Sequence, residues 1–194
     1  MSIIRVDKEG PQDEYYTPDD VVEILVPFLH KKGFKTIWCP CDKHTSEYVK
    51  VLSNNGFNVV HTHLEDGQDF LTYVPDFDFD AIITNPPFSI KNEIIQKCIS
   101  YGKPWALLLS ATCIQSASLI QHLSKQTINF IIFDRRISYS GDRPPFPSWY
   151  FTHGILDKNE FYIYQEDPND LYLKWYNSVE EHTSVSTKKE VDLW

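Results

Sequence analysis

The sequence predicts an α/β fold in which a mostly parallel sheet carries helices on both faces. Strand-like and helix-like segments alternate along the chain with short connections between them. The middle strand candidates are apolar throughout, which is typical of strands that are buried on both faces of a parallel sheet. At 194 residues and 42% hydrophobic composition, the chain can form one domain with a full core. We expect that domain over residues 15–165, a flexible arm over 1–14 and a tail over 166–194.

The first helix is expected to begin at Thr17, because Thr17 is a good N-cap and Pro18 suits the first helical position. Gly33 is expected to end it. The later elements follow from apolar runs for strands and from amphipathic spacing for helices. Strands are expected at residues 36–39, 57–63, 80–84, 105–109 and 128–133. Helices are expected at residues 45–54, 90–101 and 114–125, with a helical turn at 70–73.

The C-terminal part of the domain is expected to add an antiparallel edge. Residues 148–156 and 160–165 read as two strands joined around residues 157–159, which predicts a closing antiparallel pair. The carboxyl ends of the parallel strands should meet at one edge of the sheet, where ligands of such folds bind.

Composition limits the location and the metal chemistry that we expect. The sequence has no run of 18 apolar residues, so no membrane span is expected. The N-terminus lacks the apolar core of a secretion signal, which predicts a cytoplasmic protein. The four cysteines lack the spacing of a zinc site, so we expect reduced thiols and no metal.

Residues 81–88 form the most informative stretch, because an apolar strand runs directly into Asn85-Pro86-Pro87-Phe88. Two prolines cannot donate to a sheet ladder, so the strand must stop there. The resulting rigid loop offers the Asn85 side-chain oxygen and the Pro86 carbonyl as acceptors for both N–H bonds of a planar amino group. Phe88 can stack on the attached ring. An ordinary proline-terminated turn is the alternative interpretation.

This tetrapeptide resembles the Asn-Pro-Pro-Phe/Tyr motif of the amino-methyltransferases that use S-adenosylmethionine (SAM). Members of that superfamily methylate the exocyclic nitrogen of adenine, cytosine or guanine, or a glutamine amide. The resemblance implies a Rossmann-like class I methyltransferase fold, SAM as the cofactor, and a catalytic role for Asn85, Pro86, Pro87 and Phe88. It also places Asn85 beside the cofactor.

Two upstream segments carry the resemblance to the cofactor site. Tyr15-Tyr16-Thr17-Pro18 looks like the Tyr-Thr-Pro element of adenine-N6 methyltransferases, and we expect Tyr16, Thr17 and Pro18 to contact SAM. A free Thr17 hydroxyl and unpaired helix N–H groups would suit the carboxylate of the cofactor. Cys39-Pro40-Cys41-Asp42 stands where the first SAM motif follows the first strand, although it contains no glycine. The resemblance implies contacts from Cys39 and Pro40, and a bond from Asp42 to the cofactor's ammonium group.

The end of the second strand and the following loop complete the expected cofactor site. His63 and Glu65 are the candidates for the ribose hydroxyls. Gly67-Gln68-Asp69-Phe70 resembles the motif whose acid accepts from the cofactor's adenine amine while its neighbour packs on that ring. An ordinary helix N-cap is the alternative role for Asp69.

The expected acceptor is a nucleic acid, although the net charge of −9 opposes a polyanion. Arg135, Arg136 and Arg143 form a local basic cluster and could grip phosphates. Ion pairs with nearby aspartates are the alternative for each arginine. Phe146 and Trp149 are expected to face Phe88 across the base pocket, with a buried strand start as the alternative.

In order and spacing of motifs, the chain resembles small phage- or mobile-element-type DNA adenine-N6 methyltransferases. This resemblance runs from about Tyr15 to Phe88, and more weakly to Leu156. RNA adenine or a protein glutamine remains open as the target of the same chemistry. A non-catalytic SAM-fold protein that engages another protein is the alternative of a different class, and a protein partner or self-association is left open.

Overall fold

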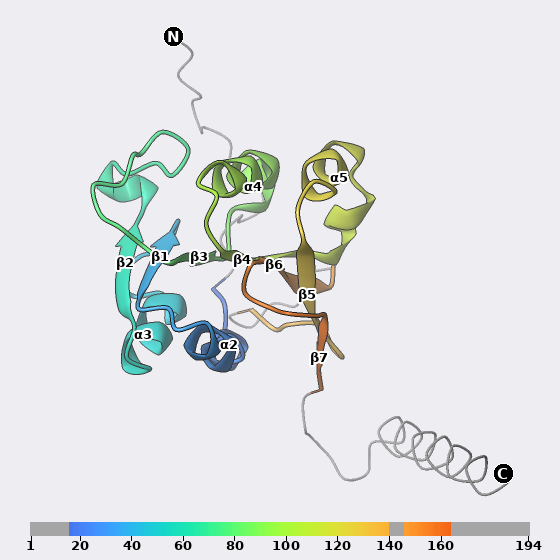
Figure 1. Cartoon of the computed structure of the whole chain (residues 1–194), viewed down its shortest axis with the longest axis horizontal. Helices are drawn as coiled ribbons and strands as arrows, with labels where there is room; N and C mark the ends of the chain where they lie inside the picture. The colour runs from blue at the N-terminus through green and yellow to red at the C-terminus, as the bar shows by residue number, and fades with distance from the viewer. Residues whose placement is uncertain (1–15, 140–145, 164–194) are drawn as a thin grey trace, which may run out of the picture. The chain divides into compact units, whose positions relative to one another are not determined.

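The computed structural model describes residues 16–139 and 146–163 (Figure 1). The expected N-terminal arm at 1–14, the tail at 166–194, Tyr15 and Arg143 lie outside the described residues. Among those that are described, no helix is long and apolar enough to cross a bilayer.

Within the described residues, seven strands form one sheet in the order β2-β1-β3-β4-β6-β5-β7. Their bounds are β1 (Thr36–Pro40), β2 (Asn58–Thr62), β3 (Ala81–Thr84), β4 (Trp105–Ser110), β5 (Ile128–Phe133), β6 (Ser148–His153) and β7 (Glu160–Tyr162). Strands β2, β1, β3 and β4 pair in parallel, and β6 enters antiparallel beside β4. This arrangement confirms the Rossmann-like sheet that the sequence predicted, mostly parallel and with an antiparallel element.

The expected antiparallel strand is present as β6, but the prediction that it pairs with β7 was wrong. Strand β6 pairs antiparallel with β4 and with β5, and β7 pairs in parallel with β5. Strands β6 and β7 are therefore separated by β5. The physical reason lies in β6, which is buried on both faces and needs a neighbour on each side, whereas β7 is a three-residue strand at the sheet edge.

The helices divide between the two faces of the sheet (Figure 1). Helices α2 (Val26–Lys31) and α3 (Glu47–Asn54) lie on one face, and α4 (Lys91–Ser100) and α5 (Ala117–Leu123) lie on the other. Strand β1 leads to α3, whereas its neighbour β3 leads to α4. The chain therefore leaves two adjacent strands toward opposite faces, which is the topological switch point where ligands bind in such sheets.

The expected helix at 17–33 is broken into two short helices. Helix α1 spans Asp19–Glu23 and α2 begins at Val26. Pro27 has no N–H to donate to the preceding turn, so the helical ladder is interrupted before it. Pro18, and not Thr17, is the N-cap of α1. Thr17 instead faces the cavity described below.

Three short 3₁₀ helices carry the chain out of the strands at the ligand-binding edge. They are η1 (Leu64–Asp66), η2 (Phe88–Ile90) and η3 (Ala111–Gln115). Residues 63–80 are all described, and none of them forms a strand. Where a further crossover helix and strand could stand, this chain has a loop that packs on the sheet through aromatic side chains.

The buried ring of Trp38 in β1 anchors that loop. Four rings have centroids 5.0–5.6 Å from that of Trp38, and they belong to Phe70, Phe77, Phe79 and Tyr101. The indole N–H donates to Thr62 Oγ1 at 3.0 Å, so its polar atom is satisfied inside the core. Aromatic rings bury large areas and favour such edge-on contacts, which compensates for the missing regular structure.

Asp80 ties the amino ends of β1 and β3 together. Its Oδ2 accepts from the backbone N–H groups of Lys35 at 2.7 Å and Thr36 at 2.8 Å. We expect Asp80→Ala to lower the free energy of unfolding by about 1.5–3 kcal/mol, because hydrogen bonds to a charged group are lost. Urea unfolding measures this change. Asp76→Ala removes the same charge from an exposed position of the same loop and is the control; equal losses in both variants would contradict the assigned role.

Candidate active site

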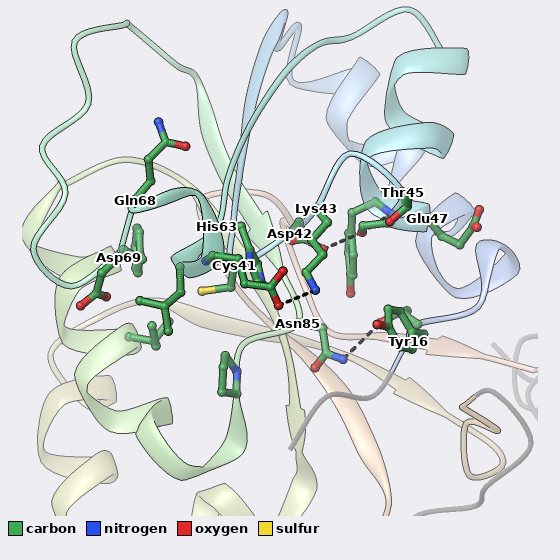
Figure 2. A pocket seen from close by; sticks show the side chains of 18 of the residues that line it. Tyr16, Cys41, Asp42, Lys43, Thr45, Glu47, His63, Gln68, Asp69 and Asn85 are labelled. Atoms are coloured by element: carbon green, nitrogen blue, oxygen red, sulfur yellow. Dashed lines mark hydrogen bonds and ion pairs between the residues drawn. The ribbon is translucent and has the colours of Figure 1, made fainter. Parts of the chain in front are cut away.

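A cavity of about 430 Å³ lies at the carboxyl ends of β1, β2 and β3 (Figure 2). Its walls come from four segments: the residues before α1, the loop from β1 into α3, the loop after β2, and the start of the segment after β3. The volume is in the range of sites that hold small molecules and cofactors. The cavity therefore occupies the switch point that the topology creates.

The cavity brings together most of the residues that the sequence proposed for cofactor binding or for catalysis. Those that line it are Tyr16, Thr17, Asp42, His63, Asp69, Phe70, Asn85 and Pro87. Five other residues that the sequence proposed do not line the cavity: Pro18, Cys39, Pro40, Pro86 and Phe88. Pro18 caps α1, Cys39 and Pro40 belong to β1 and are buried, and Pro86 is buried beneath the loop.

Cys41 supplies the turn that a glycine would normally supply after the first strand. Its φ is 66°, in the left-handed region, and it is the one non-glycine residue with positive φ among the described positions. A side chain there costs conformational energy, and such strain concentrates at functional sites. Burial raises the pKa of its thiol above the ordinary value, so Cys41 stays protonated and shapes the loop.

Asp42 is the central ionisable group of the cavity and is only 8% exposed. Ser46 Oγ donates to its Oδ1 at 2.6 Å, and Thr84 Oγ1 lies 2.6 Å from its Oδ2. Burial raises the pKa of Asp42 to about 7, although both hydrogen bonds act to lower it. At neutral pH the carboxyl group is therefore poised between its two protonation states.

The Thr84 hydroxyl explains why the structure accommodates the protonated form of Asp42. Its oxygen contacts both Asp42 and the carbonyl oxygen of Pro40, but it has a single proton to donate. When Asp42 is protonated, its own O–H can donate to Thr84 while Thr84 donates to Pro40. When Asp42 is ionised, one of these oxygen–oxygen contacts has no proton. A cation at the cavity face of Asp42 would favour the ionised form.

An ion pair joins the β1 loop to the β2 loop beside the cavity. Lys43 Nζ lies 2.8 Å from Glu65 Oε1, and Figure 2 shows this contact next to Asp42. The hydrogen bond from Lys43 lowers the pKa of Glu65. His63 accepts from the Glu65 N–H through Nδ1 at 3.1 Å and so caps η1. Both candidates at the end of β2 thus have partners within the protein.

Asp69 and Phe70 combine a structural position with a place in the cavity wall. Asp69 Oδ1 accepts from the Leu71 N–H at 3.0 Å and so caps the turn over residues 70–72, where we expected a helical turn and no helix forms. Phe70 is 3% exposed and meets Trp38 edge to face, with centroids 5.1 Å apart. The aromatic core therefore extends to the cavity and holds this wall.

Thr17 and Asn85 meet across the cavity. Asn85 Nδ2 donates to Thr17 Oγ1 at 3.2 Å, and Figure 2 shows the amide oxygen turned away from this bond. The expectation of a free Thr17 hydroxyl was therefore wrong. The N–H groups of Asp20 and Val21 are also taken, since they donate to the carboxylates of Asp19 and Asp20 at 2.9 Å. The five-residue α1 does not offer an open anion site there.

The proposed base-binding aromatics separate into two groups. Phe88 and Phe146 meet edge to face with centroids 5.0 Å apart. Trp149 lies in β6, packs against Phe130 of β5 with centroids 6.3 Å apart, and is partly buried against the core. Phe146 therefore contacts Phe88 directly, whereas we expected the two rings to face each other across a base pocket, and Trp149 lies at the start of β6.

The structure describes two of the three proposed phosphate-binding arginines, Arg135 and Arg136. Arg135 Nε lies 3.3 Å from Asp134 Oδ1, which is the ion pair that the alternative interpretation named. Arg136 is exposed at the same edge of the sheet, directly after β5. Lys91, which also follows the Asn85–Phe88 loop, donates to the Phe88 carbonyl at 3.1 Å.

The sequence analysis did not identify the side chains that hold Asp42 in place or the tyrosine that lines the cavity wall. Ser46 and Thr84 hold Asp42, and Tyr48 lines the wall beside Thr17. The available signals were the spacing of four residues between Asp42 and Ser46, and a polar threonine ending an apolar strand just before Asn85. Tyr48 gave no signal, because it fits the apolar stripe of α3.

The described residues contain no group of three or more histidines, cysteines, aspartates or glutamates that could hold a metal ion. All four cysteines are free thiols. The side chains that line the cavity supply carboxylates, hydroxyls, amides, a thiol, an imidazole, an ammonium group and aromatic rings.

Comparison with known proteins gives fold-level similarity. No protein-family model matches the sequence, and no curated protein matches it. A predicted O-methyltransferase from Agrobacterium tumefaciens aligns with a TM-score of 0.44 and 12% identity, over 73% of this chain and 84% of that chain. The O-methyltransferase TomG from Streptomyces achromogenes, solved in complex with SAM, aligns with a TM-score of 0.41 and 8% identity, over 69% and 79%. The mitomycin 7-O-methyltransferase MmcR aligns with a TM-score of 0.37 and 12% identity, over 68% of this chain and 53% of that chain.

The pKa of Asp42 predicts a specific dependence of stability on pH. The folded protein holds the Asp42 proton up to about pH 7, whereas the ordinary value is 3.8. The free energy of unfolding should therefore fall as pH rises between these values. Asp42→Asn keeps an acceptor for Ser46 and gains a donor for Thr84, so it mimics the protonated acid. Between about pH 5.5 and 8, the stability of the variant relative to wild type should rise by about 2 kcal/mol.

Urea unfolding at several pH values measures this difference. Asp76→Asn changes an exposed aspartate of the loop after β2 and should track the wild type. Parallel stability curves for wild type and Asp42→Asn would contradict the titration assigned to Asp42.

Proposed function

We propose that this protein is a SAM-dependent methyltransferase that transfers a methyl group to the exocyclic N6 amine of adenine in DNA. The observation that carries the proposal is that Asp42 and Asn85 face one cavity at the switch point of a methyltransferase-type sheet. The same cavity can then hold a methyl donor and place it beside the Asn85–Phe88 loop. The residue pattern of that loop supports an amino group as the acceptor.

The charges of the cavity suit a cationic cofactor. Its ionisable lining has four acids against one lysine, and the acids are Asp42, Glu47, Glu65 and Asp69. SAM carries an ammonium group and a sulfonium, and the sulfonium supplies an activated methyl group. Asp42 would hold the ammonium, and the nearby positive charge would ionise this carboxyl group and lower its pKa. Phe70 offers an aromatic edge to an adenine ring in the same wall.

The Asn85–Phe88 loop would activate the acceptor mainly through orientation. An aromatic amine is a poor nucleophile because its lone pair is delocalised into the ring. Oxygen acceptors at Asn85 and Pro86 would hold both N–H bonds and favour a more tetrahedral nitrogen with its lone pair toward the donor. Such orientation contributes several kcal/mol to catalysis. A base from duplex DNA must first leave the stack, and Phe88 would receive it.

A second candidate keeps the chemistry and changes the acceptor to RNA adenine or a protein glutamine amide. One observation favours the glutamine target, because RNA is a polyanion like DNA: nearby cations are engaged, since Arg135 pairs with Asp134 and Lys91 bonds the Phe88 carbonyl. Duplex DNA binding depends on cations that are available to phosphates, and the net charge is −9. A non-catalytic SAM-fold protein would bind the cofactor and transfer nothing.

Asp42→Asn should weaken SAM binding by about 1.5–3 kcal/mol, the contribution of a hydrogen bond to a charged group. The wild-type affinity should increase as pH rises through about 7, because the proton on Asp42 must leave before the ammonium binds. The variant should show no such increase. Calorimetric titration of SAM at about pH 6 and 8 measures both effects. Unchanged affinity in the variant would place the ammonium elsewhere.

Asn85→Ala should abolish methyl transfer and leave SAM affinity within about three-fold, because the amide acts on the acceptor nitrogen. Incubation with DNA and labelled SAM, followed by digestion to nucleosides, should place label in N6-methyladenosine. Asn92→Ala removes a half-buried asparagine of α4 whose amide contacts Ser118 of α5 and which does not line the cavity, and is the matched control.

The position of the label decides between the candidates. Label in RNA or on a glutamine side chain would move the assignment to the second candidate. SAM binding without transfer to DNA, RNA or protein would leave the non-catalytic alternative.

A further inference from the structure

A groove of about 410 Å³ lies between the first two helices and the sheet edge formed by β5 and β7. Its apolar residues are Ile24, Pro27, Phe28, Ile131, Phe161 and Tyr162. None of the described residues that line this groove also lines the cavity at the carboxyl ends of the strands. The groove is therefore a separate concave surface that the proposed function does not use.

The break between α1 and α2 leaves apolar side chains at one wall of the groove. Leu25 and Leu29 are fully buried in the core, whereas Ile24 and Phe28 are half-buried and Pro27 is exposed. Apolar surface that gathers in one groove, rather than being scattered singly, is typical of a binding surface.

The edge strand supplies the other wall. In the parallel pair of β5 and β7, Ile131 is opposite Glu160 and Phe133 is opposite Tyr162. Tyr162 is 36% exposed, and its ring lies 6.3 Å from that of Phe133, centroid to centroid. Alternate positions of a strand share a face. Glu160 and Tyr162 therefore present a carboxylate and an aromatic ring on the same side of the sheet.

The groove is acidic as well as apolar. Its charged residues are Asp20 and Glu23 of α1 and Glu160 of β7. No lysine, arginine or histidine is among the described residues that line it. Within the described part of the chain, none of these three acids forms an ion pair.

Two lysines near the groove are bound to another acid. Lys31 and Lys32, at the end of α2, lie 2.8 and 2.7 Å from the carboxylate oxygens of Asp157. The hydrogen bond to Asp157 raises the pKa of Lys31, and Glu160 adds a smaller effect at longer range. The carboxylates of α1 thus remain available to cations of a partner.

The charge of the groove decides among its possible occupants. A second copy of this chain, docked through the same face, would bring two sets of carboxylates together, and each chain has a net charge of −9. Residues 164–194 of this chain contain seven acids against three lysines. A segment with apolar side chains flanked by lysines or arginines instead matches both the apolar lining and the charge.

We propose that this groove is a docking site for a basic amphipathic segment of another protein. Ile24, Phe28 and Tyr162 receive its apolar side chains, and Asp20 and Glu23 pair with its cations. Burial of the apolar surface favours the complex, and the carboxylates select a basic partner over an acidic one. The inference goes beyond the proposed function and does not depend on it.

The groove adjoins the candidate active site along the chain. Tyr16 and Thr17 line the cavity, and Asp20 and Glu23 follow at the groove. For the proposed function, a basic partner docked here would bring cations toward the site of an acidic protein, and cations are what duplex DNA binding requires.

A synthetic peptide of leucine and lysine in helical amphipathic spacing tests the proposal beside two matched peptides. One matched peptide replaces every lysine with glutamate, and the other replaces every leucine with serine. Fluorescence anisotropy measures the binding of each labelled peptide to the full chain, and ¹⁵N NMR shifts map its position. We expect the leucine–lysine peptide to shift signals of residues 20–28 and 160–162. Both matched peptides should bind at least about 10-fold more weakly.

Two pairs of variants separate the groove from the overall charge. Glu23→Lys reverses an exposed charge in the groove, and Asp76→Lys makes the same change in the exposed loop after β2. Binding of the leucine–lysine peptide should weaken by about 10-fold in Glu23→Lys, because like charges then face each other, and by less than about three-fold in Asp76→Lys. Tyr162→Ser should weaken it by about five-fold or more, whereas Tyr162→Phe keeps the ring and should match the wild type.

Three outcomes overturn the inference. The first is that the leucine–lysine peptide does not bind, or that its shifts centre outside the groove. The second is an equal loss in Glu23→Lys and Asp76→Lys, which would reduce binding to attraction by net charge. The third is a wild-type protein that sediments as a dimer and becomes monomeric in Tyr162→Ser, which would assign the groove to a second copy of this chain.

Discussion

The buried contact between Asp42 and Thr84 is the constraint on which the site depends. It links the carboxyl ends of β1 and β3, the two neighbouring strands whose chains depart toward opposite faces of the sheet. A cavity opens at this point because the chain diverges there, and the contact holds its floor together. Cys41 accepts a left-handed backbone so that Asp42 can turn inward. An unfavourable conformation and a desolvated carboxyl group are thus concentrated in two consecutive residues.

Burial of the Asp42 carboxyl group reduces the free energy of unfolding at neutral pH. A ligand with a positive charge can restore this stability. Burial keeps Asp42 near half protonation at about pH 7, where an ordinary aspartate would be fully ionised. Groups with such perturbed pKa values gather at functional sites, because a stabilising partner arrives with the ligand. Ser46 and Thr84 satisfy the acid when no partner is present. The site is therefore organised before any cofactor binds.

The two halves of the site are supported by different parts of the core. The wall that contains Phe70 rests on the aromatic cluster around Trp38, on the face that α4 and α5 cover. Asn85 is held by the Thr17 hydroxyl from the segment before α1. A change in one support should therefore leave the other largely in place. This separation gives the protein a means to bind a cofactor and to orient an acceptor independently.

The sequence by itself determined the sheet, the edge that carries the site and the stop of β3 at Pro86. These features depend on local signals: apolar strand runs, helix periodicity and the missing N–H of proline. It also indicated Asp42 and Asn85, because polar residues stood directly after apolar strands. Pro27 carried the signal for the break between α1 and α2, but the amphipathic pattern around it outweighed that signal.

Only the tertiary structure decided which side chains meet. Whether β6 pairs with β7 or lies between β4 and β5 depends on burial on both faces, and either choice fits the same short connection. Thr17 reads as a helix cap until Asn85, 68 residues away, is placed beside it. The pairing of Arg135 with Asp134, and the hold of Thr84 on Asp42, depend equally on geometry. Hydrogen bonds and pKa shifts arise from distances and desolvation, and the folded chain alone creates both.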